Sequence, residues 1–445
     1  MRTAPLIWAA LMLSGCTVGP VFAPPKIDLP DRYALLAPVS EARAEDVQWW
    51  KNFNDPLLTR LVEETLSGNL DLAEAQARLR EAEALARRDA VLISGDGEVN
   101  ASGASRSAAE QANAEITADI GLAGEQRWRS KGAEQRREAA RFDELEARRS
   151  VLAELSVAYV DLRFAQRSLE ILNQDLQSRQ RTLRDINTLL AAGETTQLDV
   201  VRAESLVSET RAQVPNLTAA VVRQRNRIST LMGRPVGMLD VDLGYRGSQP
   251  NPHLKAQPGA PADLLRARND IRQSERLYAA AVSDLGVAEA ARYPSLRLRG
   301  AILAPLHGGS TTRSLIAGLT MPLFNQPALA ASADAAQARV NQAYLQWRKV
   351  VLVAVEEVEN AQADLQASIA TTREAQRLLD LNRQSLDLSR ELLSNRGSIT
   401  VLDVLDRERA LSDARALHAR SLRDQAVDYI ILRTALGQGH PIEGE

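Results

Sequence analysis

The chain contains one segment twice. GETTQLDVVRAESLVSETR occupies residues 193–211, and GSITVLDVLDRERALSDAR occupies residues 397–415. The two segments align without a gap at an offset of 204 residues (397 − 193), and the alignment continues to Gly233 and Gly437. A repeat at this distance in a chain of 445 residues predicts two copies of one structural unit. The fold of this chain must therefore contain the same structural unit twice.

The region before the first repeated segment has the pattern of a coiled coil. Nothing from about residue 129 to 192 breaks a helix, and leucine recurs there every seven residues, at Leu155, Leu162, Leu169, Leu176, Leu183 and Leu190. Ala158, Ala165, Leu172 and Ile186 complete the apolar seam, and Arg179 is its one polar member. After Gly193, the seam continues with Val200, Val207, Val214, Val221 and Ile228. A strict seven-residue period with a glycine turn predicts a left-handed, antiparallel helical hairpin, with helices at about 129–192 and 197–232.

Two other stretches alternate between apolar and polar residues, as half-buried strands do. They predict β-hairpins at about 97–123 and 295–322. Asp119, Arg297 and Arg299 lie on the polar side of these strands, opposite apolar neighbours. Strands of 9 to 11 residues are long enough to cross a membrane, with the apolar side toward lipid and these three residues toward a lumen. An ordinary amphipathic sheet in a soluble protein is the alternative interpretation.

Each half of the chain therefore has the same predicted plan of a helix, a β-hairpin, a long helix and a return helix. The halves are residues 51–235 and 263–437, with a linker at 236–262 that is rich in Pro and Gly, and a short tail at 438–445. In the second half the long helix is expected at about 327–395 and its return at about 400–436. Open sheet edges are not tolerated in lipid, so four strands alone cannot span a membrane. The fold class predicted is mainly α with a membrane β-barrel that several copies share, continued by a barrel of helices.

The N-terminus has the features of an export signal. A basic residue and a short apolar stretch precede LSGC, which resembles a bacterial lipobox and ends at Cys16, the only cysteine. The resemblance implies that residues 1–15 are removed and that Cys16 receives lipid at the start of a tail, residues 16–50. Thr17 after the cysteine favours export to the outer membrane. An ordinary secretory signal with a chance cysteine is the alternative. At the end of the tail, Trp49 and Trp50 are expected to pack on the helices, and anchoring at the membrane interface is the alternative.

Charge and motifs exclude several classes of protein. Lys and Arg number 54 against 57 Asp and Glu, so the chain has no basic excess for binding nucleic acid. The four histidines are scattered and have no partners at metal-ligand spacing, so no metal site is expected. No nucleotide-binding or catalytic motif is present, which predicts a protein that is not an enzyme and that carries no cofactor other than lipid on Cys16.

The order of several motifs resembles the TolC-like outer membrane factor family, in its lipoprotein (NodT-type) branch. The motifs are CTVGP at Cys16, WWKNFNDPLLTRLV at Trp49, GETTQLDVVRAESLV at Gly193, LMGRP at Leu231, DIRQSERLYAAAVSDLGVAEAARYPSLRL at Asp270, MPLFN at Met321, VEEVENAQADL at Val355 and LDVLDRERAL at Leu402. The resemblance implies a homotrimer with a twelve-stranded barrel in outer membrane lipid. It also implies a passive efflux duct for small molecules such as drugs, toxic compounds or metal ions. The implied partners are a periplasmic adaptor (membrane fusion) protein and an inner-membrane resistance-nodulation-division pump.

The same resemblance assigns roles at the hairpin tips. Gly193 and Gly397 are the two turns, and Asp403 and Asp406 match acidic residues that ring the periplasmic aperture in this family. Ser394 and Ile399 stand where better-known members have a Tyr and an Arg that help to close the aperture. The alternative is that Asp403, like Asp199 in the first copy, only stabilises the start of a return helix.

Two other functions remain open from the sequence. One is a type I secretion duct for polypeptides, which belongs to the same class of channel. The other is a periplasmic coiled-coil adaptor or scaffold lipoprotein.

Overall fold

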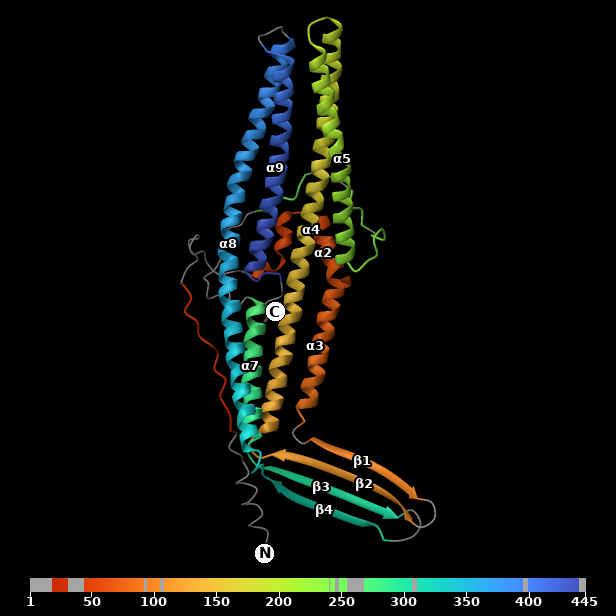
Figure 1. Ribbon diagram of the computed structural model, residues 1–445, viewed down its shortest axis with the longest axis vertical. Coiled ribbons are helices and arrows are strands. Elements are labelled where there is room, and N and C mark those ends of the chain that lie inside the picture. The colour runs from red at the N-terminus through yellow and green to blue at the C-terminus, as the bar shows by residue number, and fades with distance from the viewer. Residues whose placement is uncertain are drawn as a thin grey trace. The chain divides into compact units, whose positions relative to one another are not determined.

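The computed structural model describes residues 18–30, 44–91, 94–104, 108–239, 241–244, 248–253, 268–305, 310–394 and 399–439. Cys16, Thr17 and Gly397 lie outside these residues. The regular elements follow the duplicated plan, with an additional pair of short helices near the start (Figure 1). In chain order they are η1 (Ala44–Phe53), α2 (Pro56–Gly68), α3 (Leu70–Asp89), β1 (Ser94–Ala104), β2 (Ala108–Gly121), α4 (Glu125–Ala191), α5 (Gln197–Leu231), α7 (Asn269–Ala290), β3 (Ser295–Pro305), β4 (Thr312–Thr320), α8 (Gln326–Ser394) and α9 (Val401–Ala435).

The chain divides into two compact units. The sheet unit contains Ala75–Glu144 and Asn269–Leu352, together with the tail as far as Asp28. The hairpin unit contains Leu29–Glu74, Leu145–Arg268 and Val353–Glu445. Helices α3, α4 and α8 contribute residues to both units.

The sheet unit holds one antiparallel sheet of four strands, which lie side by side in the order β1-β2-β3-β4 (Figure 1). The two hairpins of the duplicated halves are thus joined through β2 and β3, where Asp119 is paired with Arg297 and Ile120 with Leu296. One face of the sheet exposes large apolar side chains, namely Ile116, Leu315 and Leu319, which are 66%, 83% and 67% exposed. Strand residues alternate between faces, so Glu115, Asp119, Arg297 and Arg299 share the other face.

The hairpin unit contains the two helical hairpins, α4 with α5 and α8 with α9. The seam predicted from the seven-residue period is confirmed in the first hairpin, because its members are buried or half-buried. Ile186, Val200, Ala203 and Leu206 form one apolar cluster near the tip with Val401 and Leu405 of α9. Arg179, the polar member of the seam, is also buried, at 8% exposure.

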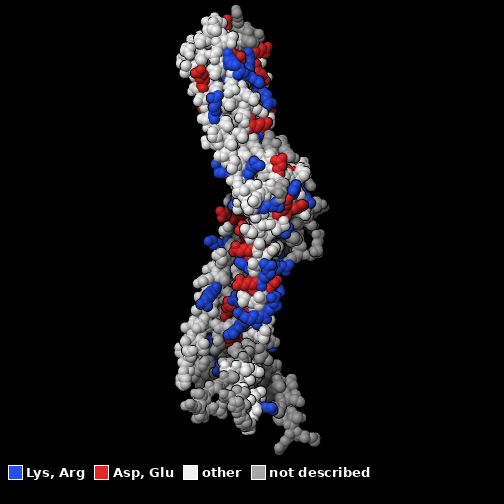
Figure 2. Space-filling view, turned by 90° about the vertical axis from the view of Figure 1, so that its right-hand side faces the viewer, with Lys and Arg blue, Asp and Glu red and all other residues white. Residues whose placement is uncertain are grey.

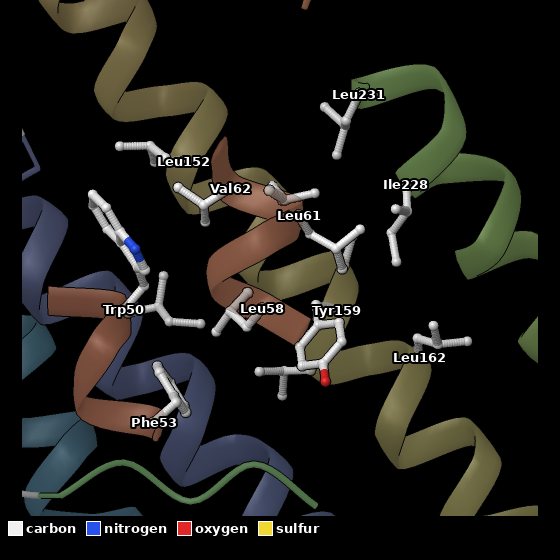
Figure 3. Packing of buried hydrophobic residues seen from close by; sticks show 14 of the residues in the cluster. Trp50, Phe53, Leu58, Leu61, Val62, Leu152, Tyr159, Leu162, Ile228 and Leu231 are labelled. Atoms are coloured by element: carbon white, nitrogen blue, oxygen red, sulfur yellow. The ribbon is translucent and has the colours of Figure 1, made fainter. Parts of the chain in front are cut away.

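The main core of the hairpin unit surrounds the short helices η1 and α2 (Figure 3). Leu58, Leu61 and Val62 of α2 are fully buried between α4 and α5, where they meet Leu162 and Ile228. Asp55 caps α2 by accepting hydrogen bonds from the backbone N–H groups of Leu57 and Leu58. The prediction that Trp49 and Trp50 pack on the helices is confirmed, since both side chains are buried in this core.

The linker between the halves is part of that core. Leu243 is fully buried, and its carbonyl oxygen accepts a hydrogen bond from the side chain of Gln166. The carbonyl oxygen of Gly244 accepts one from Arg163. The side chain of Gln249 donates to the carbonyl oxygen of Ala419. No periodic pattern marks the linker in the sequence, because irregular chain is held by such single contacts rather than by a repeating face.

The surface carries charges of both signs. Figure 2 shows Lys and Arg side chains interspersed with Asp and Glu on the face in view. This mixture agrees with the nearly balanced composition of the chain. Among the described residues, no helix combines the length and the apolar character needed to cross a bilayer.

Candidate functional site

The tip of the first hairpin turns at Gly193. This residue has φ +76°, a conformation that glycine adopts without the steric cost of a side chain. Its N–H donates to the carbonyl oxygen of Leu190, and that of Glu194 donates to the carbonyl oxygen of Leu189, which closes the end of α4. A Cβ at Gly193 would meet no atom within 4 Å, so the backbone conformation alone explains the glycine.

The first return helix begins with an acidic cap. The carboxylate of Asp199 accepts hydrogen bonds from the N–H and the hydroxyl of Thr196, at 3.2 and 2.6 Å, and from the hydroxyl of Thr195 at 3.0 Å. The Thr196 hydroxyl is the main reason that the pKa of Asp199 lies below its usual value. The interpretation of Asp199 as a residue that stabilises the start of α5 is confirmed.

The second return helix repeats this cap at the equivalent residues. The carboxylate of Asp403 accepts from the hydroxyl and the N–H of Thr400, both at 2.7 Å, and the N–H of Asp403 donates back to the Thr400 hydroxyl at 3.3 Å. These two exchanges form a capping box. The Thr400 hydroxyl lowers the pKa of Asp403. Asp403 thus caps the N-terminus of α9.

The second predicted aperture residue differs from the first. Asp406 lies one turn further along α9 and is exposed, and it has no hydrogen bond or ion pair with any described residue. Ile399, at the closing position named above, packs partly buried beside Leu393 and Val404. The side chain of Ser394 and all of Gly397 fall outside the described residues.

A polar cluster lies between α4, α8 and α9, further from the tip. The Oε1 atom of Glu408 accepts hydrogen bonds from Ser178, Thr182 and Arg390, at 3.1, 2.7 and 2.6 Å. Its other carboxylate oxygen is buried without a hydrogen-bond partner among the described residues.

An ion pair extends this cluster along α4 and α9. Asp175 accepts from Arg415 at 2.5 Å and from Ser412 at 2.6 Å. Asp175 and Arg415 line a cavity of about 270 Å³, together with Ser178, Arg390 and Glu408. We refer to Asp175, Ser178, Arg390, Glu408 and Arg415 as the interhelical polar cluster.

Sequence reasoning missed the interhelical polar cluster, although two signals pointed to it. Arg179, the exception in the apolar seam, lines the same cavity. Glu408 and Arg415 both belong to the repeated segment, and their equivalents Glu204 and Arg211 are exposed. Only the pairing of helices in space distinguishes the two copies.

The charged residues predicted for the sheet are brought together by the strand register. Asp119 and Arg297 lie directly opposite each other on β2 and β3 and form an ion pair at 2.7 Å. Arg299 pairs with Glu115 of β2 at 2.5 Å. All four side chains are on one face of the sheet, so this face carries two adjacent cross-strand ion pairs. Glu115 was not singled out in the sequence, because it precedes the alternating stretch that begins at Ile116.

Sequence comparison identifies the family. The profile of the family described as outer membrane efflux protein matches residues 61–234 and 260–438. The chain belongs to the outer membrane efflux protein family. The match falls on both halves of the chain. The family predicted from the sequence and the duplicated, mainly helical fold are confirmed.

Similar proteins agree with this assignment. Nodulation protein T of Rhizobium leguminosarum bv. trifolii is 33% identical over 97% of this chain and 96% of its own length. The pyoverdine export outer membrane protein OpmQ of Pseudomonas aeruginosa is 28% identical over 99% of this chain and 97% of its own. Among solved structures, the outer-membrane channel OprN is 29% identical, covers 95% of this chain and 99% of its own, and superposes with a TM-score of 0.85.

Proposed function

We propose that three copies of this chain form a passive exit duct through which small solutes cross the periplasm and the outer membrane. The observation that carries the proposal is the match of the outer membrane efflux family to both halves of the chain. The sheet supports assembly of more than one copy, because β1 and β4 are its edges and edges in lipid require partners. Three sheets of four strands supply the twelve strands of a closed barrel.

The duct would provide the path, and partners would provide the energy. We propose that the hairpin tips meet a periplasmic adaptor and that an inner-membrane resistance-nodulation-division pump drives transport. OpmQ is named for the export of pyoverdine, and the similarity over nearly the whole chain favours export of solutes rather than of polypeptides here as well. The N-terminal Cys16 would carry lipid and anchor each copy in the outer membrane.

The charged sites take separate roles in this assembly. Asp119, Arg297 and Arg299 would face the barrel lumen, because the opposite face of their sheet exposes apolar side chains suited to lipid. Asp403 and Asp406 would place six carboxylates around the axis at the aperture, and such rings of charge select ions. Asp406 is the more available of the two, since the carboxylate of Asp403 is occupied by Thr400.

Native mass spectrometry of protein extracted from the membrane with detergent tests the assembly. The expected mass is that of three chains, each lacking residues 1–15 and carrying lipid on Cys16. A monomer without lipid would refute both the trimer and the anchor, and would favour a scaffold protein.

Conductance across a planar bilayer tests the aperture. The variant with both Asp403→Ala and Asp406→Ala should lose most of the block by multivalent cations. Asp413→Ala is the matched control, because it also removes an exposed carboxylate from α9, two turns beyond Asp406. Unchanged block in the double variant would refute the role of these residues at the aperture.

A further inference from the structure

The first described residues of the chain are held against the sheet unit by Trp128 of α4. The indole N–H of Trp128 donates to the carbonyl oxygen of Val18 at 2.8 Å. The N–H of Val18 donates in turn to the carbonyl oxygen of Ala123 at 3.3 Å. Both backbone polar groups of Val18 are therefore bound. Its side chain packs on an apolar cluster made of Ala123, Trp128 and Ala290.

Two glycines leave room for the indole. Gly19 has φ +139°, and a Cβ there would lie 2.9 Å from the ring of Trp128. Gly286 of α7 approaches even more closely, because its Cβ would lie 2.4 Å from the ring. Real Cβ atoms do not come this near, so neither position accepts a side chain while the indole stays in place. The ammonium group of Lys131 lies 5.1 Å from the ring centroid and adds a cation–π contact.

A second contact follows three residues after Gly19. Phe22 meets the ring of Tyr278 on α7 edge to face, with centroids 5.5 Å apart. Phe22 also packs on the apolar cluster of Val282, Leu285, Ala336 and Val340. The tail is thus docked at two places along the sheet unit, although it forms no helix or strand.

We propose that this arrangement, the Trp128 clamp, is the docking site for the lipid-bearing end of the chain and holds its acyl chains beside the end of β2. The proposal rests on the lipid anchor at Cys16 given above. Cys16 is two residues before Val18, so the attachment point lies within about 7 Å of the clamped residue. A tail released as far as Pro30 would let the same point reach up to about 50 Å. The clamp therefore restricts the lipid attachment point to one region of the sheet unit.

Distance measurements between spin labels test the clamp. One label is placed at Thr17→Cys, next to the lipid, and the other at Leu277→Cys on α7, where the side chain is 47% exposed. Cys16 is the only native cysteine and its thiol would carry lipid, so only the two introduced residues take up label. Diluting labelled with unlabelled protein removes distances between copies. With the clamp intact, the distance distribution should be narrow.

Gly19→Ala should broaden that distribution and shift it to longer distances, because the new methyl group forces the tail off the indole. Val18→Pro should do the same by removing the N–H that donates to Ala123, and it changes no residue of the strands or helices. Gly237→Ala is the matched control. It is also a substitution at positive φ (+87°), but nothing lies within 4 Å of its Cβ. This control should leave the distribution narrow.

Two results would overturn the proposal. One is a narrow, unshifted distribution in Gly19→Ala. The other is a broad distribution in Cys16→Ser with the clamp intact, which would mean that the lipid rather than the clamp holds the end of the chain. The mass of each labelled protein separately reports whether Cys16 carries lipid. A missing lipid would refute the lipid anchor at Cys16. The distances between the spin labels would still test whether the clamp holds the tail.

Discussion

Replacing Arg179 by leucine should stabilise the first hairpin. Arg179 stands at a seam position that the seven-residue period reserves for apolar residues, and its side chain is buried. The guanidinium donates to the hydroxyl of Thr210 and to the carbonyl oxygen of Leu206, which are neutral acceptors. A buried cation with only neutral partners keeps most of its desolvation cost.

The size of the effect follows from three contributions. Burying a leucine side chain contributes about 1.5 to 3 kcal/mol. Two hydrogen bonds to neutral acceptors are lost, but the desolvation cost of the buried guanidinium, on the order of several kcal/mol, is removed with them. Thr210 is not left unsatisfied, because its hydroxyl also donates to Leu206 at 2.7 Å. We expect a net gain of about 2 kcal/mol, which slows local opening by about 30-fold.

Hydrogen exchange of the backbone amides of α4 and α5 around this position measures that opening. Arg181→Leu is the matched control, because Arg181 is exposed on the same helix and makes no hydrogen bond or ion pair with the described residues. Its effect should stay within about 0.5 kcal/mol. Faster exchange in Arg179→Leu would refute the reasoning, since it would show that the two hydrogen bonds outweigh burial of the apolar side chain.

Three further predictions concern stability. Burial raises the pKa of Asp428, and the nearby charges of Asp364 and Asp424 add to this shift, so the folded state binds its proton more tightly than the unfolded state. Asp428→Asn should therefore stabilise the protein at pH 7 and lose that advantage in acid, which melting curves at two pH values would detect. The pKa of Asp403 is lowered instead, so its contribution is present above the unfolded value and is lost as the pH falls below about 4. On acidification, amide exchange in the first turn of α9 should therefore accelerate more in the unchanged protein than in Thr400→Val, which lacks the hydroxyl. An equal acceleration in both proteins would count against the cap. Leu162→Ala removes a fully buried side chain from the core and should cost about 2 to 5 kcal/mol, measured by urea titration, and a loss below 1 kcal/mol would show that the site collapses around the cavity.

The sequence predicted the helices and strands in which apolar residues recur at regular spacing. It did not predict single contacts between residues that are far apart in the chain. The seven-residue seam and the alternating strands specify which face of each element is buried, so the hairpins could be placed along the chain. The Trp128 clamp depends on two glycines far apart in the chain, Gly19 and Gly286, and on one indole. No local sequence pattern predicts a contact between residues so far apart in the chain.

The tips illustrate a different limit. Asp199 and Asp403 have similar sequence surroundings. Each follows a threonine by three residues, which is the spacing of a helix capping box, so both caps could be expected from the sequence. Glu204 and Glu408 also match, yet only Glu408 lies in the interhelical polar cluster. A helix cap is formed by residues close together in the sequence, so the sequence predicts it. The residues that contact a helix face belong to other helices, so they are known only once the helices are packed.

The unequal surroundings of the duplicated residues have a consequence for how the protein can change over time. Glu408, Ser412 and Arg415 are tied to partners on α4, while Glu204, Ser208 and Arg211 face outward within the same chain. The second copy of the segment is therefore constrained by contacts within its own chain, whereas the first leaves these side chains available for contacts with other chains. In the proposed trimer, substitutions at Glu408, Ser412 and Arg415 would act on the packing within one chain, and substitutions at Glu204, Ser208 and Arg211 would act on contacts between chains.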